Sequence, residues 1–484
     1  MDFGKRVKMK FFAFLIFILC FFSIKFGFSQ DVEYLTLEKA IKIGLENSYE
    51  IKQARSVLAE SRHRLKAWKL SYSSYADIDA YTPVYTNRFK EIADAETGRI
   101  RIVRQNNVAY RSSLSINQPI LFTDGTLSLY NSFYNLRQED EIMYQSDVTL
   151  NLNQPLFQLS SRKISLKQAE LNLTRAQLSY SARLRDLKYR ITEQFLYLFT
   201  AQKKLELTQE VVKRAEETYQ LALKKYRTGL YSEMDLLQIE VDLSNEQNNL
   251  YNNEENFKRL LENFKLILGI ELKSEIDIFH ELTIDSIRVS EQELLDQAID
   301  NNPDRLVDEV DIKLSELDIK QARASRQFKV DMNLEYGFSQ IKNSYQDLFK
   351  KPEMTQIANI NLVIPLWDCG QNNERVLAAH ESLLSSELAL KETVESLKVE
   401  IKEIFLSLQK SQKLLMLSEK TEENAQKSYR YSVMQFNAGS ISADELSLAR
   451  NRLNTASLNN LNAKIEYLLA VEKVKMHLTP VVEE

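Results

Sequence analysis

The sequence has little glycine, proline or cysteine. Of its 484 residues, 10 are glycine, 7 are proline and 2 are cysteine. Glycine and proline punctuate helices and strands, so their scarcity excludes a fold of many short elements and predicts long, uninterrupted ones. With two cysteines the chain is no disulfide scaffold.

An excess of basic residues is also missing. The 63 lysines and arginines are outnumbered by 68 acidic residues, so the net charge is -5 and the pI about 5.8. Proteins that bind nucleic acids carry a basic surface, so we expect no nucleic acid partner.

Long apolar runs are absent apart from a short one near the N-terminus. Basic residues between Lys5 and Lys10 precede an apolar run over 11–22, and the small residue Ser29 follows. This order is typical of a secretory signal peptide, predicted over 1–29, and the run is too short to span a bilayer as a helix.

Cys20 lies inside that apolar run, behind the bulky residues Ile18 and Leu19. A lipid anchor at Cys20 is therefore disfavoured, though it stays an alternative. Once the signal is cleaved, Cys369 is the only cysteine left, so no disulfide within the chain is expected.

One short pattern occurs twice, 210 residues apart. KKYRTGLYSEMDLL begins at Lys224 and VMQFNAGSISADELS at Val433. The matched positions are an aromatic (Tyr226, Phe436), a glycine (Gly229, Gly439), a serine (Ser232, Ser442) and an acid (Asp235, Glu445). Each pattern predicts a turn between two helices, with the serine as the N-cap of the second helix.

The duplication extends well beyond the turn. Neither 161–227 nor 371–437 contains glycine or proline, and apolar residues recur there every three or four positions, so each is predicted to be one long helix. With their return helices they form helical hairpins over 161–268 and 371–478. Upstream, GLENSYE and AIDNNPD match at an offset of 254, so the first half is 44 residues longer than the second.

Segments before the long helices alternate in strand fashion, over about 72–155 in the first half and 327–365 in the second. Within these ranges, each alternating stretch has about the 9–11 residues of a transmembrane strand. A soluble antiparallel sheet is the alternative. Asp77 and Asp79 would share one face of a strand, and a wet channel lining or a loop explains them better than acid–base catalysis. The 44 extra residues are interpreted as an added hairpin that turns at about 122–126.

The order of these motifs resembles the TolC-like outer membrane efflux proteins. Each half has a short helix with its LEN or NNPD motif, strands ending in QPLF or IPLW, a very long helix, the glycine turn and a return helix. The resemblance covers about residues 33–479. It divides the chain into a signal peptide (1–29), a first repeat (30–270), a linker (271–290), a second repeat (291–479) and a tail (480–484).

The resemblance implies an α+β membrane protein in the outer membrane of a Gram-negative bacterium. In the family, three protomers share one β-barrel in the outer membrane lipid and one α-helical tunnel through the periplasm. The partners it implies are two further copies of the chain, a periplasmic adaptor protein and an inner membrane transporter. Such a homotrimer is the exit duct of an efflux or type I secretion system. A typical member has two strands per half, so the barrel would hold twelve strands, or eighteen if the added hairpin joins it.

The resemblance also implies the functional sites. The two turns, with Tyr226, Gly229, Ser232, Phe436, Gly439 and Ser442, would form the periplasmic tip that docks the adaptor. Asp235, Asp444 and Glu445 are candidates for an acidic pore constriction. Alternatively, Glu445 only stabilises the first turn of its helix, where the helix dipole favours an acidic side chain.

Motifs of catalysis are missing. The four histidines are isolated, and the sequence has no metal-binding HExxH, phosphate-binding loop or Gly-x-Ser-x-Gly pattern. We therefore expect no enzyme activity, no metal and no cofactor. The alternative from another class is a periplasmic or surface scaffold, a trimeric coiled coil with a β cap and no pore.

Overall fold

The structure is a computed structural model, and it describes residues 34–93, 100–138, 141–157, 160–279, 287–438, 440–441 and 443–479. The predicted signal peptide with Cys20, part of the linker and the tail lie outside these residues. The chain divides into two compact units. The first comprises residues up to 48, 190–285 and 428–465, and the second comprises 49–189, 286–427 and the residues from 466 onward.

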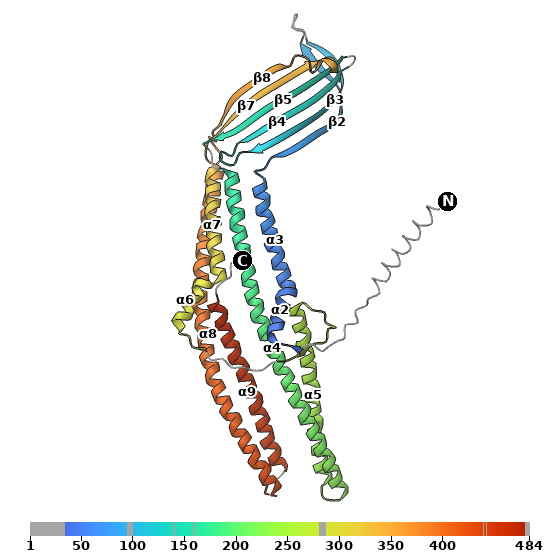
Figure 1. Cartoon of the computed structure of the whole chain (residues 1–484), viewed down its shortest axis with the longest axis vertical. Coiled ribbons are helices and arrows are strands. Elements are labelled where there is room, and N and C mark those ends of the chain that lie inside the picture. Colours follow the sequence, from blue (N-terminus) through green and yellow to red (C-terminus); the bar gives the residue numbers. More distant parts are fainter. Residues whose placement is uncertain are drawn as a thin grey trace, which may run out of the picture. The chain divides into compact units, whose positions relative to one another are not determined.

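The helices occur in four matched pairs (Figure 1). The pairs are α2 (Leu37–Asn47) with α6 (Glu291–Asn301), α3 (Tyr49–Leu70) with α7 (Pro303–Ala324), α4 (Ser161–Arg227) with α8 (Gln371–Asn437), and α5 (Glu233–Leu268) with α9 (Ala443–Leu478). Both members of a pair have the same length, which is 11, 22, 67 and 36 residues in turn. The predicted long helices and the duplication are thereby confirmed.

Local chemistry explains where several helices begin. Thr36 and Ser290 cap α2 and α6, because each side chain accepts a hydrogen bond from the backbone N–H three residues later. Asn302 does the same for Arg305 at 2.8 Å, and Pro303 occupies the first position of α7, where a missing N–H costs nothing.

In the first unit, α2 packs closely against α4 and α5. A Cβ atom on Gly44 would clash with Ile191, and the rings of Phe195 and Phe264 lie 5.9 Å apart in the buried core. Close by, β1 (Tyr34–Leu35) pairs in parallel with β6 (Asp277–Ile278). The small residue at position 44 is what lets the short helix reach this core.

The second unit contains the matching core around α6. Its buried residues include Ala298, Ile401 and Val474, from α6, α8 and α9. These three positions correspond, at the two offsets, to Gly44, Ile191 and Phe264 of the first unit. Ala298 and Val474 replace a smaller and a larger residue, so the two cores fill similar space differently.

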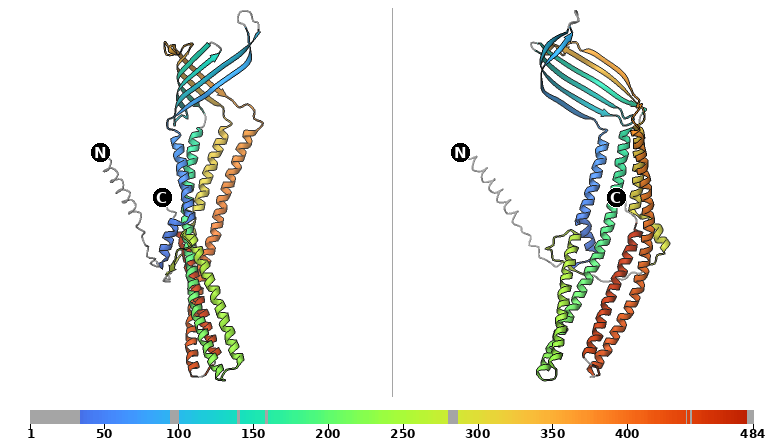
Figure 2. Two further views of the ribbon diagram at one scale, coloured as in Figure 1. Left: turned by 90° about the vertical axis from the view of Figure 1, so that its right-hand side faces the viewer. Right: turned by 180° about the vertical axis from the view of Figure 1, so that it is seen from behind.

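The second unit also contains one curved, six-stranded sheet (Figures 1 and 2). Its strands are β2 (Tyr75–Ala93), β3 (Ile100–Pro119), β4 (Thr126–Gln138), β5 (Glu141–Leu156), β7 (Lys329–Lys342) and β8 (Glu353–Val363). They lie in that order, and every neighbouring pair is antiparallel. A short 3-10 turn, η1 (Tyr345–Asp347), lies between β7 and β8.

Five of the six strands are longer than the sequence predicted, and β2 and β3 exceed the prediction most. β2 has 19 residues and β3 has 20, against the expected 9–11. The pairing of β2 with β3 continues beyond the bulge between Tyr81 and Val84. Its far end, which β4 does not reach, is a two-stranded ribbon. Charged residues such as Arg88 and Lys90 interrupt the apolar alternation there, which hides the strand in the sequence, while the ladder of backbone hydrogen bonds continues.

Candidate functional site

The sheet separates apolar from polar side chains. In β5, Leu150 and Leu152 point to one face, and Asn151 and Asn153 to the other. Because the register joins each residue to a partner on the same face, the two sets can be followed across all six strands. The apolar face includes Ile78, Leu114, Ile116, Leu129, Val148, Leu150, Leu152, Leu334, Phe338, Ile360 and Leu362. The polar face includes Asp77, Asp79, Ser113, Ser115, Ser132, Asp147, Asn151, Asn153, Asn333, Glu335, Ser339, Asn359 and Asn361.

The apolar face is open to its surroundings in the single chain. Leu150 at its centre is 44% exposed, and Ile360 on the edge strand β8 is 68% exposed. A soluble monomer rarely exposes a continuous apolar surface spread over six strands. This face is therefore made to contact lipid or another apolar surface.

Side-chain hydrogen bonds connect neighbouring strands on the polar face. The carboxylate of Asp147 accepts from Ser132 at 2.8 Å and from Ser339 at 2.5 Å. Asn153 donates to Asn333 at 2.6 Å, and Asn333 donates to Asn359 at 3.0 Å, so one ladder crosses three strands. Asp77 and Asp79 lie on this face, as the sequence predicted. These hydrogen bonds connect polar side chains of neighbouring strands into a network on this face.

Both edges of the sheet are open. In the part of the chain that the structure describes, β2 and β8 each have a single neighbouring strand. Open edges present unpaired backbone N–H and C=O groups, which pair readily with another chain. The sheet is thus incomplete by itself on two sides.

Aromatic side chains follow the ends of three strands, on the side of the sheet where the strands join the helices. Phe122 follows β3, Phe157 follows β5 and Trp367 follows β8, and these three strands run in the same direction. All three side chains are more than 80% exposed. Exposed aromatics in a row at one height are typical of a membrane–water boundary.

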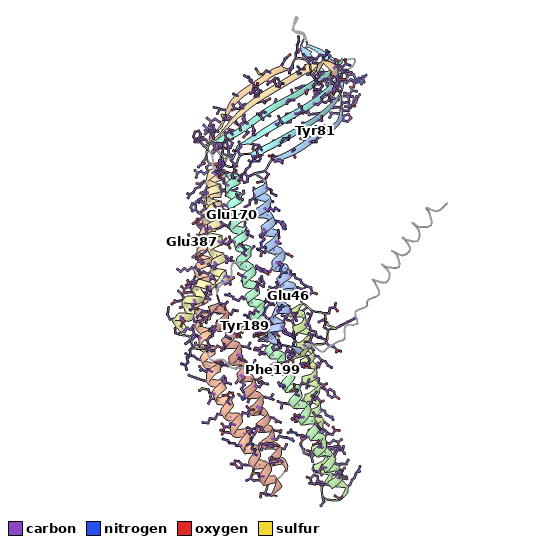
Figure 3. All side chains as sticks on the ribbon, viewed as in Figure 1. Glu46, Tyr81, Glu170, Tyr189, Phe199 and Glu387 are labelled. Atoms are coloured by element: carbon purple, nitrogen blue, oxygen red, sulfur yellow. The ribbon has the colours of Figure 1, made fainter. Side chains whose placement is uncertain are left out.

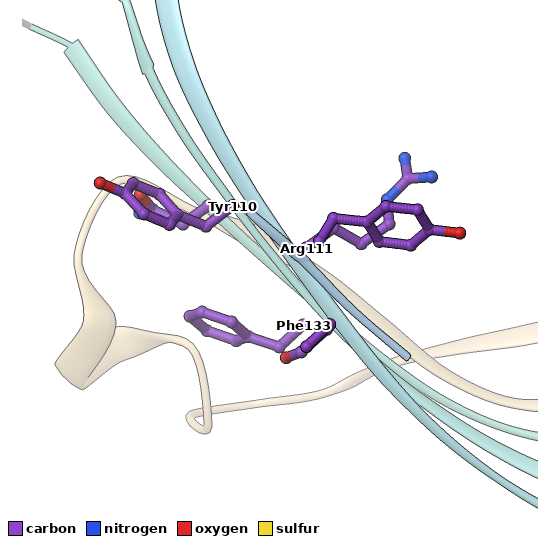
Figure 4. A pocket seen from close by; sticks show the side chains of 7 residues that line it. Tyr110, Arg111 and Phe133 are labelled. Carbon is purple, nitrogen blue, oxygen red and sulfur yellow. The ribbon is translucent and has the colours of Figure 1, made fainter. Parts of the chain in front are cut away.

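A hollow of about 410 Å³ lies on the sheet beside the bulge in β2 (Figure 4). It is lined by Ala80, Tyr81, Tyr110, Arg111, Ser112, Phe133 and Asn135. Tyr110 and Phe133 point to one side of the strands and Arg111 to the other. Among these lining residues there is no His, Asp or Glu to activate a hydroxyl group, so the hollow does not have the make-up of a catalytic site.

The predicted helical turns have the same backbone bonds in both halves. The N–H of Leu230 donates to the carbonyl of Lys225 at 2.9 Å, and that of Ser440 to Gln435 at 2.8 Å, 210 residues on. Such a bond, from a residue just beyond a helix back to its last turn, defines a Schellman turn. Gly229 has φ +75°, the left-handed conformation that glycine tolerates best.

The docking candidates of the first turn are all described. Tyr226 is 39% exposed at the end of α4, and Ser232 is exposed directly before α5. Lys225 places its ammonium group 4.9 Å from the ring of the neighbouring Tyr231. In the second turn, Gly439 and Ser442 and the side chain of Phe436 lie outside the described residues.

The pore candidates stand at the beginnings of the return helices. Asp235 is in the first turn of α5, and Asp444 and Glu445 are in the first turn of α9. Glu445 is exposed, and the side chains of the other two lie outside the described part. Glu445 occupies a position where an acid stabilises the helix. Its position is compatible with both predicted roles, the acidic constriction and the stabilisation of the helix start.

Two structural features of this chain could not be predicted from its sequence. One is His477, buried near the end of α9, with Nε2 lying 3.8 Å from a carboxylate oxygen of Glu400. The other is a set of contacts in which Arg162 and Lys163 hold the β3–β4 turn. Neither has a signal in the sequence, because each depends on segments brought together by folding.

Groups for metal chemistry do not converge in the described residues: no three of His, Cys, Asp and Glu are placed to hold a metal ion. Cys369, the one cysteine among them, is exposed. None of the described helices is long and apolar enough to cross a membrane.

A protein-family comparison matches most of the chain. The family model described as outer membrane efflux protein matches residues 109–270 and 294–477. No curated protein sequence matches the chain significantly.

Several solved structures share the fold. The outer membrane channel CmeC of Campylobacter jejuni is 14% identical with a TM-score of 0.72, covering 93% of this chain and 87% of that one. The outer membrane protein VceC of Vibrio cholerae is 12% identical with a TM-score of 0.67, covering 92% and 97%. The MtrE outer membrane channel of Neisseria gonorrhoeae, in an open state, is 14% identical with a TM-score of 0.67, covering 91% and 88%.

Proposed function

Because the chain belongs to the outer membrane efflux protein family, we propose that it forms a homotrimeric outer membrane duct, the exit of a tripartite efflux or type I secretion system. In this proposal the sheets of three copies close into one barrel in the outer membrane of a Gram-negative bacterium. The helices form a tunnel in the periplasm, and the helical turns meet an adaptor linked to an inner membrane transporter.

The observation that carries the proposal is the two-faced sheet with two open edges. An exposed apolar face opposite a hydrogen-bonded polar face is the pattern of a strand wall between lipid and water. Within a bilayer, unpaired edges are not tolerated, so the wall has to close on itself.

Closure with further copies preserves the antiparallel pattern. Six strands alternate in direction, so β8 runs opposite to β2 of the next copy. Six strands per chain are too few to leave a wide lumen, whereas several copies joined edge to edge remove every open edge. The exposed aromatics Phe122, Phe157 and Trp367 then mark the boundary of the membrane on the helix side.

The long helices also support assembly. Side chains cover them along their length, including Glu170 on α4 and Glu387 on α8 (Figure 3). Leu384 and Leu388 lie four residues apart on one face of α8, and both are exposed. Such apolar stripes are stabilised when neighbouring copies cover them.

The test separates the duct from the trimeric scaffold. We expect the protein in the outer membrane fraction, extracted by detergent as a heat-modifiable trimer that produces discrete ion conductance in planar bilayers. A soluble periplasmic trimer without conductance would support the scaffold and contradict the duct.

A further inference from the structure

Two strands of the sheet have no counterpart in the second half. β2 starts 254 residues before β7, the same offset as α3 and α7, while Pro155 and Pro365 close β5 and β8 at the offset of α4 and α8. The pair β3 and β4 is left over. The 44 additional residues are therefore this hairpin and its connections, inserted between β2 and β5.

The inserted strands are not rooted in helices. β2 follows α3, β5 leads into α4, β7 follows α7 and β8 leads into α8, whereas β3 and β4 are joined to each other by the turn Ile120–Gly125. Each chain thus places six strands over the ends of four helices.

The hairpin is a full part of the wall. β3 pairs with β2 and β4 pairs with β5 without interruption at the helix-side end. Its side chains keep the same division, with Ile116 and Leu129 on the apolar face and Ser115 and Ser132 on the polar one. A flap outside the wall would not need two faces that match its neighbours.

Contacts with α4 and with the end of β5 hold the turn of the hairpin. The ammonium group of Lys163 donates to the carbonyl of Phe122 at 3.0 Å, and Gln154 donates to the carbonyl of Thr123 at 2.9 Å. Arg162 lies 3.8 Å from the carboxylate of Asp124. The free end of the hairpin is thereby fixed at the level where its neighbours join their helices.

The number of strands decides the girth of a barrel. With strands about 4.8 Å apart and tilted about 40°, each strand adds about 6 Å of circumference. Three copies of six strands give about 110 Å, whereas three copies of the four rooted strands give about 75 Å. The helices α3, α4, α7 and α8 of three copies number twelve. Twelve helices side by side, about 9–10 Å apart, also give a circumference of about 110 Å.

Resting on the proposed trimeric duct, we propose that the β3–β4 hairpin widens its membrane end to the girth of its helical end, so that it passes bulky cargo such as partly folded polypeptide. After about 5 Å for side chains on each side, the lumen is about 25 Å wide instead of about 14 Å. One helix is about 10–12 Å across, so two abreast pass only the wider opening.

The first experiment tests edge closure by disulfide formation in a Cys369→Ser background. Cysteines are placed on β2 (Asp77→Cys or Asp79→Cys) and on β8 (Asn359→Cys or Asn361→Cys), all on the polar face, in all four pairings. We expect at least one pair to yield covalent trimers upon oxidation. The matched control, Ser115→Cys on β3 with the same β8 positions, should not link. Linking through β3 but not β2 would show that β2 is not the edge that joins the next copy, so the wall would not contain all six strands, and it would overturn the proposal.

The second experiment measures the size limit of the lumen. Polyethylene glycols of increasing diameter are added to either side of a single channel, and those that enter lower its conductance. We expect polymers about 20 Å wide to enter from the sheet side of the full chain and to be excluded when residues 100–140 are deleted. Exclusion of polymers wider than about 14 Å by the full chain would overturn the proposal even if the deletion variant fails to fold. A protein that conducts no ions at all would contradict the proposed function itself, and a conducting channel with the narrow limit would contradict only this inference.

Discussion

Gly269 lies directly against the backbone carbonyl of Asn47. A Cβ atom at position 269 would clash with that oxygen, and the φ of Gly269 is +71°. The glycine therefore serves both to end α5 and to let α2 approach it. It is a packing constraint where the ends of α2 and α5 meet in the first unit.

This relationship predicts a large effect of Gly269→Ala. We expect a loss of about 2–4 kcal/mol, from the left-handed conformation and the clash together. Gly229→Ala is the matched control, since it has φ +75° but nothing within 4 Å of an added Cβ, and it should lose only about 1–2 kcal/mol. The midpoint of thermal dissociation of the purified protein measures both. Equal losses would show that the contact with Asn47 does not constrain the fold.

Adaptor docking at the turns can be tested with a pair of tyrosines. If the turns dock the adaptor, Tyr226→Ala should lower crosslinking to the adaptor and export, because it removes a half-exposed aromatic anchor. Tyr251→Ala, in the body of α5 and 68% exposed, should leave both unchanged. Gly229→Val should also impair docking, since a β-branched residue strains its left-handed turn, and the matching sequence predicts the same effect for Gly439→Val. Normal assembly with undiminished crosslinking in all three turn variants would place docking elsewhere.

Glu445 is predicted to contribute to an acidic constriction. Three carboxylates around a narrow wet opening favour cations, so Glu445→Gln should lower cation selectivity and block by divalent ions in single-channel recordings. Glu445→Asp keeps the charge and should retain most of the selectivity. Unchanged selectivity in Glu445→Gln, with a stability loss of about 0.3–1 kcal/mol, would leave Glu445 only its role at the start of α9.

His477 predicts a dependence of stability on pH. Burial, together with the nearby Arg185 and Lys473, lowers the pKa of His477 from 6.5 to about 4. Between these values the unfolded chain binds a proton that the folded one does not, so stability is full above pH 6.5 and falls as the pH drops toward 4, by about 3 kcal/mol in total. His477→Gln should remove this part of the decline in the thermal midpoint. His380→Gln, at an exposed histidine, should leave it, and equal pH profiles for both variants would contradict the assignment.

The long helices could be predicted from the sequence almost to the residue. The stretches without glycine or proline coincide with α4 and α8, and Gly269 follows the end of α5. Local signals suffice there because a helix forms its hydrogen bonds within one segment. The same reasoning located the turn at Gly229, whose positive φ the structure confirms.

The sheet was predictable only in part. The alternating pattern of β4 and β5 located both strands, but the charged ends of β2 and β3 concealed how far those strands extend. The order of the strands and the contacts of Lys163 with the β3–β4 turn are long-range features. Strand pairing is chosen by packing and hydrogen bonds between distant segments, and no local pattern records it.

In the proposed duct, the sheet separates lipid from a watery lumen. It can be tested along β5, with single cysteines replacing Leu150, Asn151, Leu152 and Asn153 in a Cys369→Ser background in outer membranes. We expect strict alternation, in which probes at 150 and 152 are quenched by lipid-soluble quenchers and cysteines at 151 and 153 react with a charged maleimide. Equal access of the charged reagent to all four positions, without quenching by lipid, would show that the sheet stands in water and would contradict the account.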